Sequence, residues 1–135
     1  MSEIRHTLTP VGVAPAMGRG YSHVVSATGR FVAVSGQVAF DEAGAVVGPG
    51  DAARQAEQAF ENIRRCLAVE GATFDDVVKL TYYVTDIRHL AEIRAVRDQL
   101  MPGAEKPAST AVQVVALALP ELLLEIDAFA VVAAE

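Results

Sequence analysis

The clearest pattern in the chain is a helical repeat of apolar positions that begins after residue 51. Apolar side chains recur at steps of three and four, and charged side chains occupy the positions between them. Asp51 is a suitable N-cap for this segment, and Gly71 suits the left-handed conformation that ends a helix. The pattern therefore predicts a helix over 52–70 whose buried face carries Ala56, Ala59, Phe60, Ile63 and Leu67.

A second helix is predicted between Asp86, which can cap it, and the Pro102-Gly103 pair, which would end it. Its positions at steps of three and four are Leu90, Ile93, Val96, Arg97 and Leu100. Alternation predicts a strand over 77–85 with Val78, Leu80, Tyr82 and Val84 on one face. Further strands are predicted at 24–27 and 31–35, joined by a hairpin turn at 28–30, and at 110–117 and 122–132, with a short extended piece at 45–47. Residues 1–19 are expected to form an irregular lead.

The order of these elements predicts one α+β domain over residues 1–135, a mixed sheet with two helices packed on one face. The last strand, however, is apolar on both of its sides. Since two helices can cover only one face of the sheet, the other face needs a cover, and a further copy of the protein would supply it. The pattern therefore predicts a homo-oligomer.

Composition narrows the possible partners. The chain has 11 basic and 17 acidic residues and a net charge of −6, which argues against binding nucleic acid through its phosphates. Its single cysteine, Cys66, excludes an internal disulfide, and its three histidines lack the spacing of metal ligands, so no metal is predicted. No run approaches the ~20 apolar residues that span a bilayer, and no secretory signal is recognisable, so we expect a cytoplasmic protein without membrane contact.

Acidic residues in the apolar last strand are the first candidates for chemistry. Glu125 and Asp127 alternate onto the face turned away from the helices, together with Leu123 and Phe129. Burying a carboxylate there is costly unless it has a partner, and a carboxylate so placed could polarise a water or transfer a proton. The alternative is that Glu125 pairs with an arginine of the next subunit and serves assembly.

Two further segments could contribute to a site. Tyr21 could stack on a planar ligand and His23 could titrate near neutral pH, although Tyr21 could equally pack at an interface and His23 begin a strand. Gly36, followed by Gln37, lets a backbone approach a ligand closely, but a bulge or tight turn would also explain this glycine.

Taken in order, these motifs resemble one known family. They are Gly20-Tyr21-Ser22-His23, Val34-Ser35-Gly36-Gln37, 55–62, Leu67, Gly71-Ala72, 77–81, Tyr83-Val84-Thr85-Asp86, Pro107-Ala108 and Glu125-Ile126-Asp127-Ala128. From about residue 20 to residue 132 the chain resembles the reactive intermediate deaminase (Rid) family, also called the YjgF-type or L-PSP family. The resemblance implies a chorismate-mutase-like fold and a homotrimer with clefts between its subunits. It also implies hydrolysis of enamines and imines to 2-oxo acids and ammonia without a cofactor.

By motif position, the resemblance makes Glu125 the residue that orients the attacking water. It places Tyr21, His23, Gly36, Gln37, Tyr83, Ser109 and Thr110 around a small-molecule ligand. Deaminase members carry an arginine directly after the Pro-Ala pair, where it clamps the substrate carboxylate, whereas this chain has Ser109. A charge-assisted hydrogen bond between an arginine and a carboxylate contributes about 1.5–3 kcal/mol to the free energy of ligand binding. The chain therefore resembles the arginine-lacking members, and the serine argues against efficient hydrolysis of 2-imino acids.

Two functions remain open from the sequence. One is a hydrolase or deaminase that acts on a small C=N compound through Glu125 and a water. The other is a non-catalytic trimer whose clefts bind a metabolite or stabilise a partner protein. Ribonuclease activity, which is ascribed to some relatives, is disfavoured by the acidic net charge.

Overall fold

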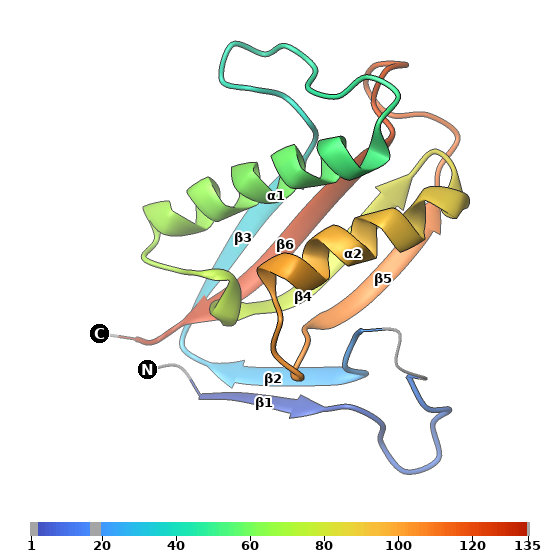
Figure 1. Ribbon diagram of the computed structural model, residues 1–135. Helices are drawn as coiled ribbons and strands as arrows, with labels where there is room; N and C mark the ends of the chain where they lie inside the picture. The colour runs from blue at the N-terminus through green and yellow to red at the C-terminus, as the bar shows by residue number, and fades with distance from the viewer. Residues whose placement is uncertain (1–2, 17–19, 135) are drawn as a thin grey trace.

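Four strands form the main sheet, in the order β3-β6-β4-β5 (Figure 1). The computed structural model describes residues 3–16 and 20–134. The strands are β3 (Arg30–Gln37), β4 (Val77–Val84), β5 (Ala108–Gln113) and β6 (Leu124–Val132). The central strand β6 runs antiparallel to β3 and β4, whereas β4 and β5 are parallel. The chain therefore crosses over once through a helix between β3 and β4, and again between β4 and β5.

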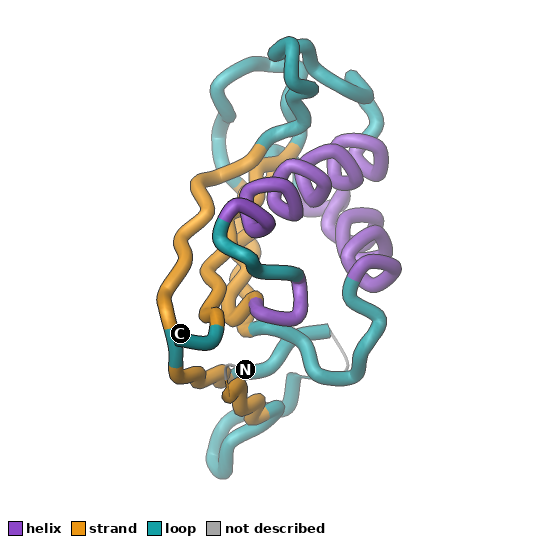
Figure 2. The backbone as a smooth tube through the Cα atoms, turned by 90° about the vertical axis from the view of Figure 1, so that its left-hand side faces the viewer, coloured by secondary structure: helices purple, strands orange, loops and turns teal. Residues whose placement is uncertain are grey.

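Both helices pack on the same face of this sheet (Figure 2). Helix α1 (Ala52–Val69) begins where the Asp51 side chain accepts a hydrogen bond from the backbone N–H of Arg54. It ends at Val69; Gly71, just beyond the C-cap, has a φ of 72°, and the Ala72 N–H donates a hydrogen bond back to the Leu67 carbonyl. Both predicted ends of this helix are confirmed.

The second helix, α2 (Leu90–Leu100), starts later than its predicted cap. Asp86 instead caps a short 3₁₀ turn, η2 (Ile87–His89), by accepting a hydrogen bond from the Arg88 N–H. A second 3₁₀ turn, η1 (Phe74–Asp76), leads from α1 into β4. None of the helices in the described part of the chain is both long and apolar enough to cross a membrane.

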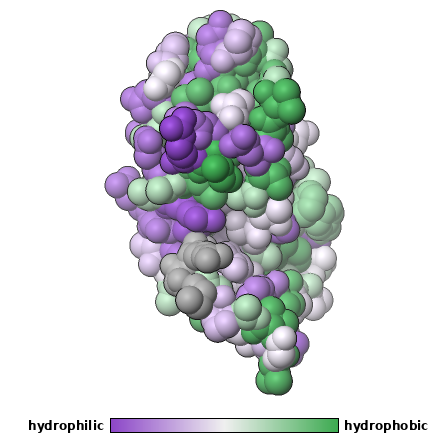
Figure 3. Space-filling model, turned by 90° about the vertical axis from the view of Figure 1, so that its right-hand side faces the viewer, coloured by the Kyte–Doolittle hydropathy of each residue, from purple (hydrophilic) through white to green (hydrophobic). Residues whose placement is uncertain are grey.

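The hydrophobic core fills the space between the sheet and the helices. Its largest fully buried side chains come from both layers and include Phe60, Ile63, Leu80, Tyr82 and Ile126. Among the described residues, no helix lies on the opposite face of the sheet. Apolar atoms gather along the side of the molecule away from the helices, on the right of Figure 3. The predicted mixed sheet with two helices on one face is confirmed.

The predicted early hairpin is wrong. Strand β2 (Val24–Thr28) pairs with β1 (Glu3–Thr7) in a separate two-stranded sheet, and the chain turns at Gly29 into β3. Gly29 has a φ of 148°, and a Cβ there would lie 2.0 Å from the Val132 carbonyl oxygen. The lead is also less irregular than expected, since β1 lies within it; residues 1–2 and 17–19 of the lead lie outside the described residues.

Three smaller differences concern the predicted strands. A bulge between Val77 and Lys79 shifts the alternation of β4, so Val77 rather than Val78 is buried. Strand β5 starts two residues before its predicted segment and ends at Gln113, four residues early. The extended piece at 45–47 forms only a single bridge between Phe40 and Val46.

Candidate functional site

The helix-free face of the sheet, which we call the open face, has an apolar end and an acidic end. Alternation along β6 directs four side chains to this face, namely Glu125, Asp127, Phe129 and Val131. Phe129 lies beside Phe31 of β3, with ring centroids 5.3 Å apart. Phe129 is 40% exposed and Phe31 is 61% exposed. Two large aromatic side chains so exposed next to each other form an uncovered apolar surface.

At the acidic end, two carboxylates lie beside a tyrosine. Tyr83 of β4 pairs across the ladder with Glu125, and its hydroxyl donates a hydrogen bond to Asp127 Oδ2 at 3.1 Å. That hydrogen bond raises the pKa of Tyr83, and the negative charges of Asp127 and Glu125 add to the effect. The phenol therefore stays protonated and can act as a hydrogen-bond donor over a wider pH range than a free tyrosine.

Gly36 provides the space in which the Glu125 side chain lies. A Cβ added to Gly36 would lie 2.0 Å from Glu125 Oε2 and 2.7 Å from its Cδ, so the carboxylate rests directly against this backbone. The ladder between β3 and β6 shifts its register between Val34 and Gln37, which confirms the bulge considered as an alternative. Gly36 therefore lies within the bulge and is also the residue against which the Glu125 carboxylate packs. The Gln37 side-chain amide donates back to the Ser35 carbonyl at 3.2 Å.

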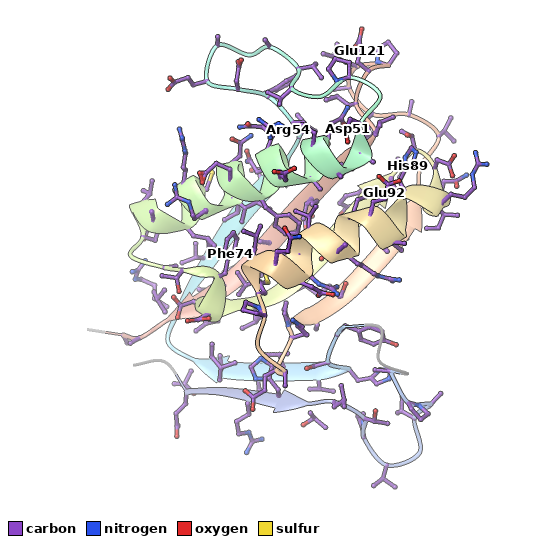
Figure 4. The ribbon with its side chains drawn as sticks, viewed as in Figure 1. Asp51, Arg54, Phe74, His89, Glu92 and Glu121 are labelled. Atoms are coloured by element: carbon purple, nitrogen blue, oxygen red, sulfur yellow. The ribbon has the colours of Figure 1, made fainter. Side chains whose placement is uncertain are left out.

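Buried Gln55 of α1 fixes the start of β6. Its amide nitrogen donates to the carbonyls of Gly48 and Glu121, and its amide oxygen accepts from the Leu123 N–H at 2.8 Å. Glu121 lies on the loop that leads into β6 (Figure 4). The buried Gln55 side chain thus links the loop before α1 to the loop before β6, and its last contact, Leu123, lies two residues before Glu125. These hydrogen bonds limit how far the start of β6 can move.

The remaining predicted site residues lie at the other edge of the sheet. Ser22 forms a bridge with Ala108 at the start of β5, and its hydroxyl donates to the Lys106 carbonyl at 2.7 Å. On either side of Ser22, the rings of Tyr21 and His23 pack edge to face at 5.3 Å. His23 Nε2 lies 2.8 Å from the Ala14 carbonyl oxygen. His23 directly precedes β2, as its alternative interpretation predicted.

Ser109 and Thr110 point to opposite sides of β5. Thr110 pairs with Thr81 on the open face, where its hydroxyl accepts a hydrogen bond from Lys79 Nζ at 2.9 Å. Ser109 pairs with Leu80, whose side chain is buried under the helices. The position that carries an arginine in deaminase members therefore lies, in this protomer, on the helix side of an edge strand.

The eight predicted site residues thus form two groups rather than one. We call Gly36, Gln37, Tyr83 and Glu125 the acidic group, and Tyr21, His23, Ser109 and Thr110 the aromatic group. Ladder spacings of about 4.8 Å between strands and about 3.3 Å along them place Ser22 roughly 20 Å from Glu125. Tyr21 and His23, which flank Ser22, are therefore too far from Glu125 of the same protomer for one ligand of metabolite size to contact all three, whereas Thr110 pairs with Thr81, two residues from Tyr83.

A large cavity elsewhere in the described part of the chain involves neither group. It has a volume of about 760 Å³ and lies between β1, η1 and the loop from Met101 to Pro107, with Phe74 (Figure 4) among its lining residues. His89 and Glu92 lie near the start of α2, in the helix layer (Figure 4). Within residues 3–16 and 20–134, no three His, Cys, Asp or Glu side chains gather as metal ligands would.

Sequence reasoning missed one functional candidate, Arg97 of α2. Its residue is 2% exposed, and its Nε and Nη2 donate to Asp98 Oδ1 at 3.0 and 2.8 Å. A Cβ added to Gly20 would lie 2.1 Å from Arg97 Nη2, so the guanidinium packs against the residue that precedes Tyr21. The available signal was an arginine among the inward positions of an amphipathic helix, where charged residues are rare.

Comparison with known proteins gives a consistent result. Residues 11–132 match the family model described as Endoribonuclease L-PSP. A RutC family protein of Pyrococcus abyssi is 37% identical over 111 residues, which cover 82% of this chain and 84% of that protein. The 2-iminobutanoate/2-iminopropanoate deaminase of Rattus norvegicus is 34% identical over 131 residues, which cover 97% and 93%.

Solved structures agree with the sequence relatives. The crystal structure of the Rid family protein YyfB from Yersinia pestis superposes with a TM-score of 0.84 and 35% identity, covering 96% of this chain and 98% of that one. The mixed sheet with two helices on one face is the chorismate-mutase-like fold expected from the motifs. The chain belongs to the Rid family, also known as the YjgF or L-PSP family.

Proposed function

We propose that the protein is a cofactor-independent hydrolase that releases ammonia from a small enamine, imine or related C=N metabolite. The observation that carries this proposal is the Glu125 carboxylate, which rests against Gly36 beside the Tyr83–Asp127 hydrogen bond. A carboxylate and a phenol on one rigid sheet can hold a water and exchange protons with it. The relative named 2-iminobutanoate/2-iminopropanoate deaminase supports the reaction class.

In the proposed reaction, a water held by Glu125 attacks the carbon of the C=N bond. An enamine first takes up a proton at carbon to become the imine. Glu125 accepts a proton from the water as the carbon–oxygen bond forms and passes it to the nitrogen, which gives the neutral carbinolamine. The hydroxyl proton of the carbinolamine is then transferred to the nitrogen, the carbon–nitrogen bond breaks with its electron pair leaving on ammonia, and the carbonyl forms. The net reaction consumes one water and releases one ammonia without any change of oxidation state.

The proposed site lies between protomers of a homotrimer. In one protomer the Tyr21–His23 segment lies roughly 20 Å from Glu125, so only a second copy can bring these residues to one ligand. The exposed Phe31–Phe129 pair supports burial of the open face against another copy. In this arrangement each cleft combines the acidic group of one protomer with the aromatic group of its neighbour.

Ser109 sets the expected substrate range. A serine hydroxyl cannot form the two parallel charge-assisted bonds that an arginine forms with a carboxylate. We therefore propose that ordinary 2-imino acids are poor substrates compared with their turnover by arginine-bearing relatives. The same substitution favours a second candidate function, a trimer that binds a metabolite in its clefts without converting it.

Ammonia release from a panel of small imines and enamines tests the proposal, and the 2-imino acids of the panel are generated in the assay by an amino-acid oxidase. We expect release above the spontaneous rate, and a loss of about 10²-fold or more in Glu125→Gln, which keeps the shape but removes proton transfer. Glu92→Gln, a carboxylate in the helix layer, is the matched control and should retain activity. If the wild type binds members of the panel but releases ammonia no faster than the spontaneous rate, the second function is supported instead.

A further inference from the structure

Two carboxamide side chains of α1 hold the segment of chain that leaves β3. Asn62 Nδ2 donates hydrogen bonds to the carbonyls of Val38 and Phe40, at 3.1 and 2.9 Å. Gln58 Nε2 donates to the same Phe40 carbonyl at 3.3 Å and to Asn62 Oδ1 at 3.0 Å. The bond between the two amides orients Asn62, because it occupies the amide oxygen and leaves the amide nitrogen facing the two carbonyls. Residues 38–40 are therefore anchored to the helix layer.

The anchored residues directly follow the bulge that brings Gly36 to Glu125. Beyond the shift in register, the ladder between β3 and β6 resumes at the pair Gln37–Ile126. Gln37 directly precedes the anchored Val38, and Ile126 directly follows Glu125. Within the described residues, a single pair of this ladder lies beyond the bulge, so the ladder alone constrains this end of β3 weakly. The hydrogen bonds from α1 act on the very next residue.

The register of β3 decides which residue meets the Glu125 carboxylate. Buried side chains fix the register before the bulge, but the bulge separates them from the residues after it. A slip by one residue would place Ser35 or Gln37 where Gly36 now lies. A Cβ at that place would lie 2.0 Å from Glu125 Oε2 and 2.7 Å from its Cδ, so the carboxylate could not keep its position. The contact therefore requires that the chain be held in register beyond the bulge.

The same helix holds the other partner of this contact. Gln55, Gln58 and Asn62 follow one another at steps of three and four, which places them along one side of α1. Gln55 accepts the hydrogen bond of the Leu123 N–H at the start of β6, and Asn62 donates to the Val38 carbonyl at the end of β3. One rigid element thus sets the relative position of the two strand ends that form the acidic group.

We propose that Asn62 is a positioning residue for the Glu125 carboxylate, acting through the register of the β3 bulge. The inference rests on the proposed function, because it concerns the carboxylate that is proposed to hold the water. Asn62 lies in the helix layer, on the other side of the sheet from Glu125, so it acts through the strand and not on a ligand. Its loss should therefore lower turnover and leave ligand binding nearly unchanged.

Asn62→Ala removes both hydrogen bonds to the end of β3. We expect kcat for ammonia release to fall by about tenfold to a hundredfold while KM changes by less than about threefold, since a misplacement of about 1 Å costs up to ~10²-fold. The lost hydrogen bonds should also lower Tm by about 2–8 °C. Thr73→Ala is the matched control, because it removes the side chain that caps η1 at the opposite end of β4. It should lower Tm by a similar amount and leave kcat unchanged.

The contact between Gly36 and Glu125 can also be measured without an activity assay. The position of a Cβ on Gly36 lies 3.0 Å from Glu125 Cγ, so a strong nuclear Overhauser effect is expected between the Gly36 Hα and Glu125 Hγ protons of the intact oligomer. The signal should persist in Thr73→Ala and weaken in Asn62→Ala. If the wild type releases no ammonia but Asn62→Ala still loses the signal, the hydrolase proposal fails and the role of Asn62 in placing the carboxylate stands.

A double-mutant cycle distinguishes positioning from a general loss of stability. In Gly36→Ala, whose Cβ already displaces the carboxylate, adding Asn62→Ala should lower kcat by less than about a further twofold. A full additional loss, an unchanged Overhauser effect in Asn62→Ala, or an equal loss of kcat in Thr73→Ala would overturn the inference. If Asn62→Ala does not fold, Gln58→Ala is the second variant, because it removes the bond that orients the Asn62 amide. It should lower kcat and the Overhauser effect by smaller factors, and no change in either would refute the role of Asn62.

Discussion

Gly36→Ala probes the proposed chemistry without touching a titratable group. The backbone of Gly36 is not in the left-handed region, so alanine is conformationally allowed there. Its Cβ would, however, lie 2.0 Å from Glu125 Oε2, 2.7 Å from Cδ and 3.0 Å from Cγ. Because ordinary contacts begin near 3.4 Å, the carboxylate must move by more than 1 Å. The atoms that must move belong to the end of a flexible side chain, so the fold should tolerate the change.

A misplacement of about 1 Å costs on the order of 10²-fold when a catalytic group must meet a defined geometry. We therefore expect Gly36→Ala to lower kcat/KM for ammonia release by about that factor. Alanine in place of glycine in a strand should leave the free energy of unfolding unchanged or raise it by up to about 1 kcal/mol. Urea unfolding and light scattering on the assayed sample establish that stability and oligomeric state are retained.

Gly103→Ala is the matched control, because a Cβ there meets no atom within 4 Å and its φ is not positive. It should match the wild type in activity and oligomeric state. If Gly36→Ala also retains wild-type activity, the carboxylate of Glu125 can move freely without cost, and its position against Gly36 has no part in the reaction. If Gly36→Ala loses both its activity and the oligomeric state of the wild type, the contact between Gly36 and Glu125 serves assembly instead.

Three further predictions concern the same surfaces. Ser109→Arg should increase affinity for 2-oxobutanoate by about tenfold to a hundredfold, as measured by calorimetry, and an unchanged affinity would show that position 109 does not face the ligand. Asp127→Asn should lower the pKa of Tyr83 toward its ordinary value, because the hydrogen bond and the charge that raise it are both weakened; the alkaline absorbance titration, compared with Tyr83→Phe, checks this. Phe129→Asp should convert the proposed trimer to monomers in light scattering, and a variant that keeps the oligomeric state of the wild type would exclude the open face as the interface.

Elements whose ends and faces are set by residues close in the sequence could be predicted from capping residues and hydrophobic periodicity. Asp51 and Gly71 define α1 because a cap and a left-handed residue act on the adjacent turn. The open-face location of Glu125 and Asp127 follows from the period of a strand alone. Strand β1 could not be predicted in this way, since its polar, largely exposed residues show no apolar alternation and its partner β2 begins some twenty residues later.

The contacts that define the proposed site depend on pairings that sequence periodicity does not encode. Gly36 meets Glu125 only because β3 lies beside β6, which follows it by almost ninety residues, and because their register shifts at the bulge. Arg97 meets Gly20 because α2 and the segment before β2 converge at the start of β5. A glycine within a predicted strand (Gly36) and an arginine on the buried face of a helix (Arg97) are both unusual in the sequence. The residues that they contact, Glu125 and Gly20, cannot be read from the sequence pattern.

The division of the site into two groups links activity to assembly. Each protomer holds its acidic group on a rigid sheet supported by Gln55, and its aromatic group on a segment supported by Arg97 and Lys106. Neither support crosses from one group to the other, and the Tyr21–His23 segment lies roughly 20 Å from Glu125 by ladder spacing. A monomer would therefore keep both groups correctly folded but could not bring Tyr21 and Glu125 to the same ligand. We therefore expect ammonia release to disappear when the proposed oligomer dissociates, even though Glu125 itself has not changed.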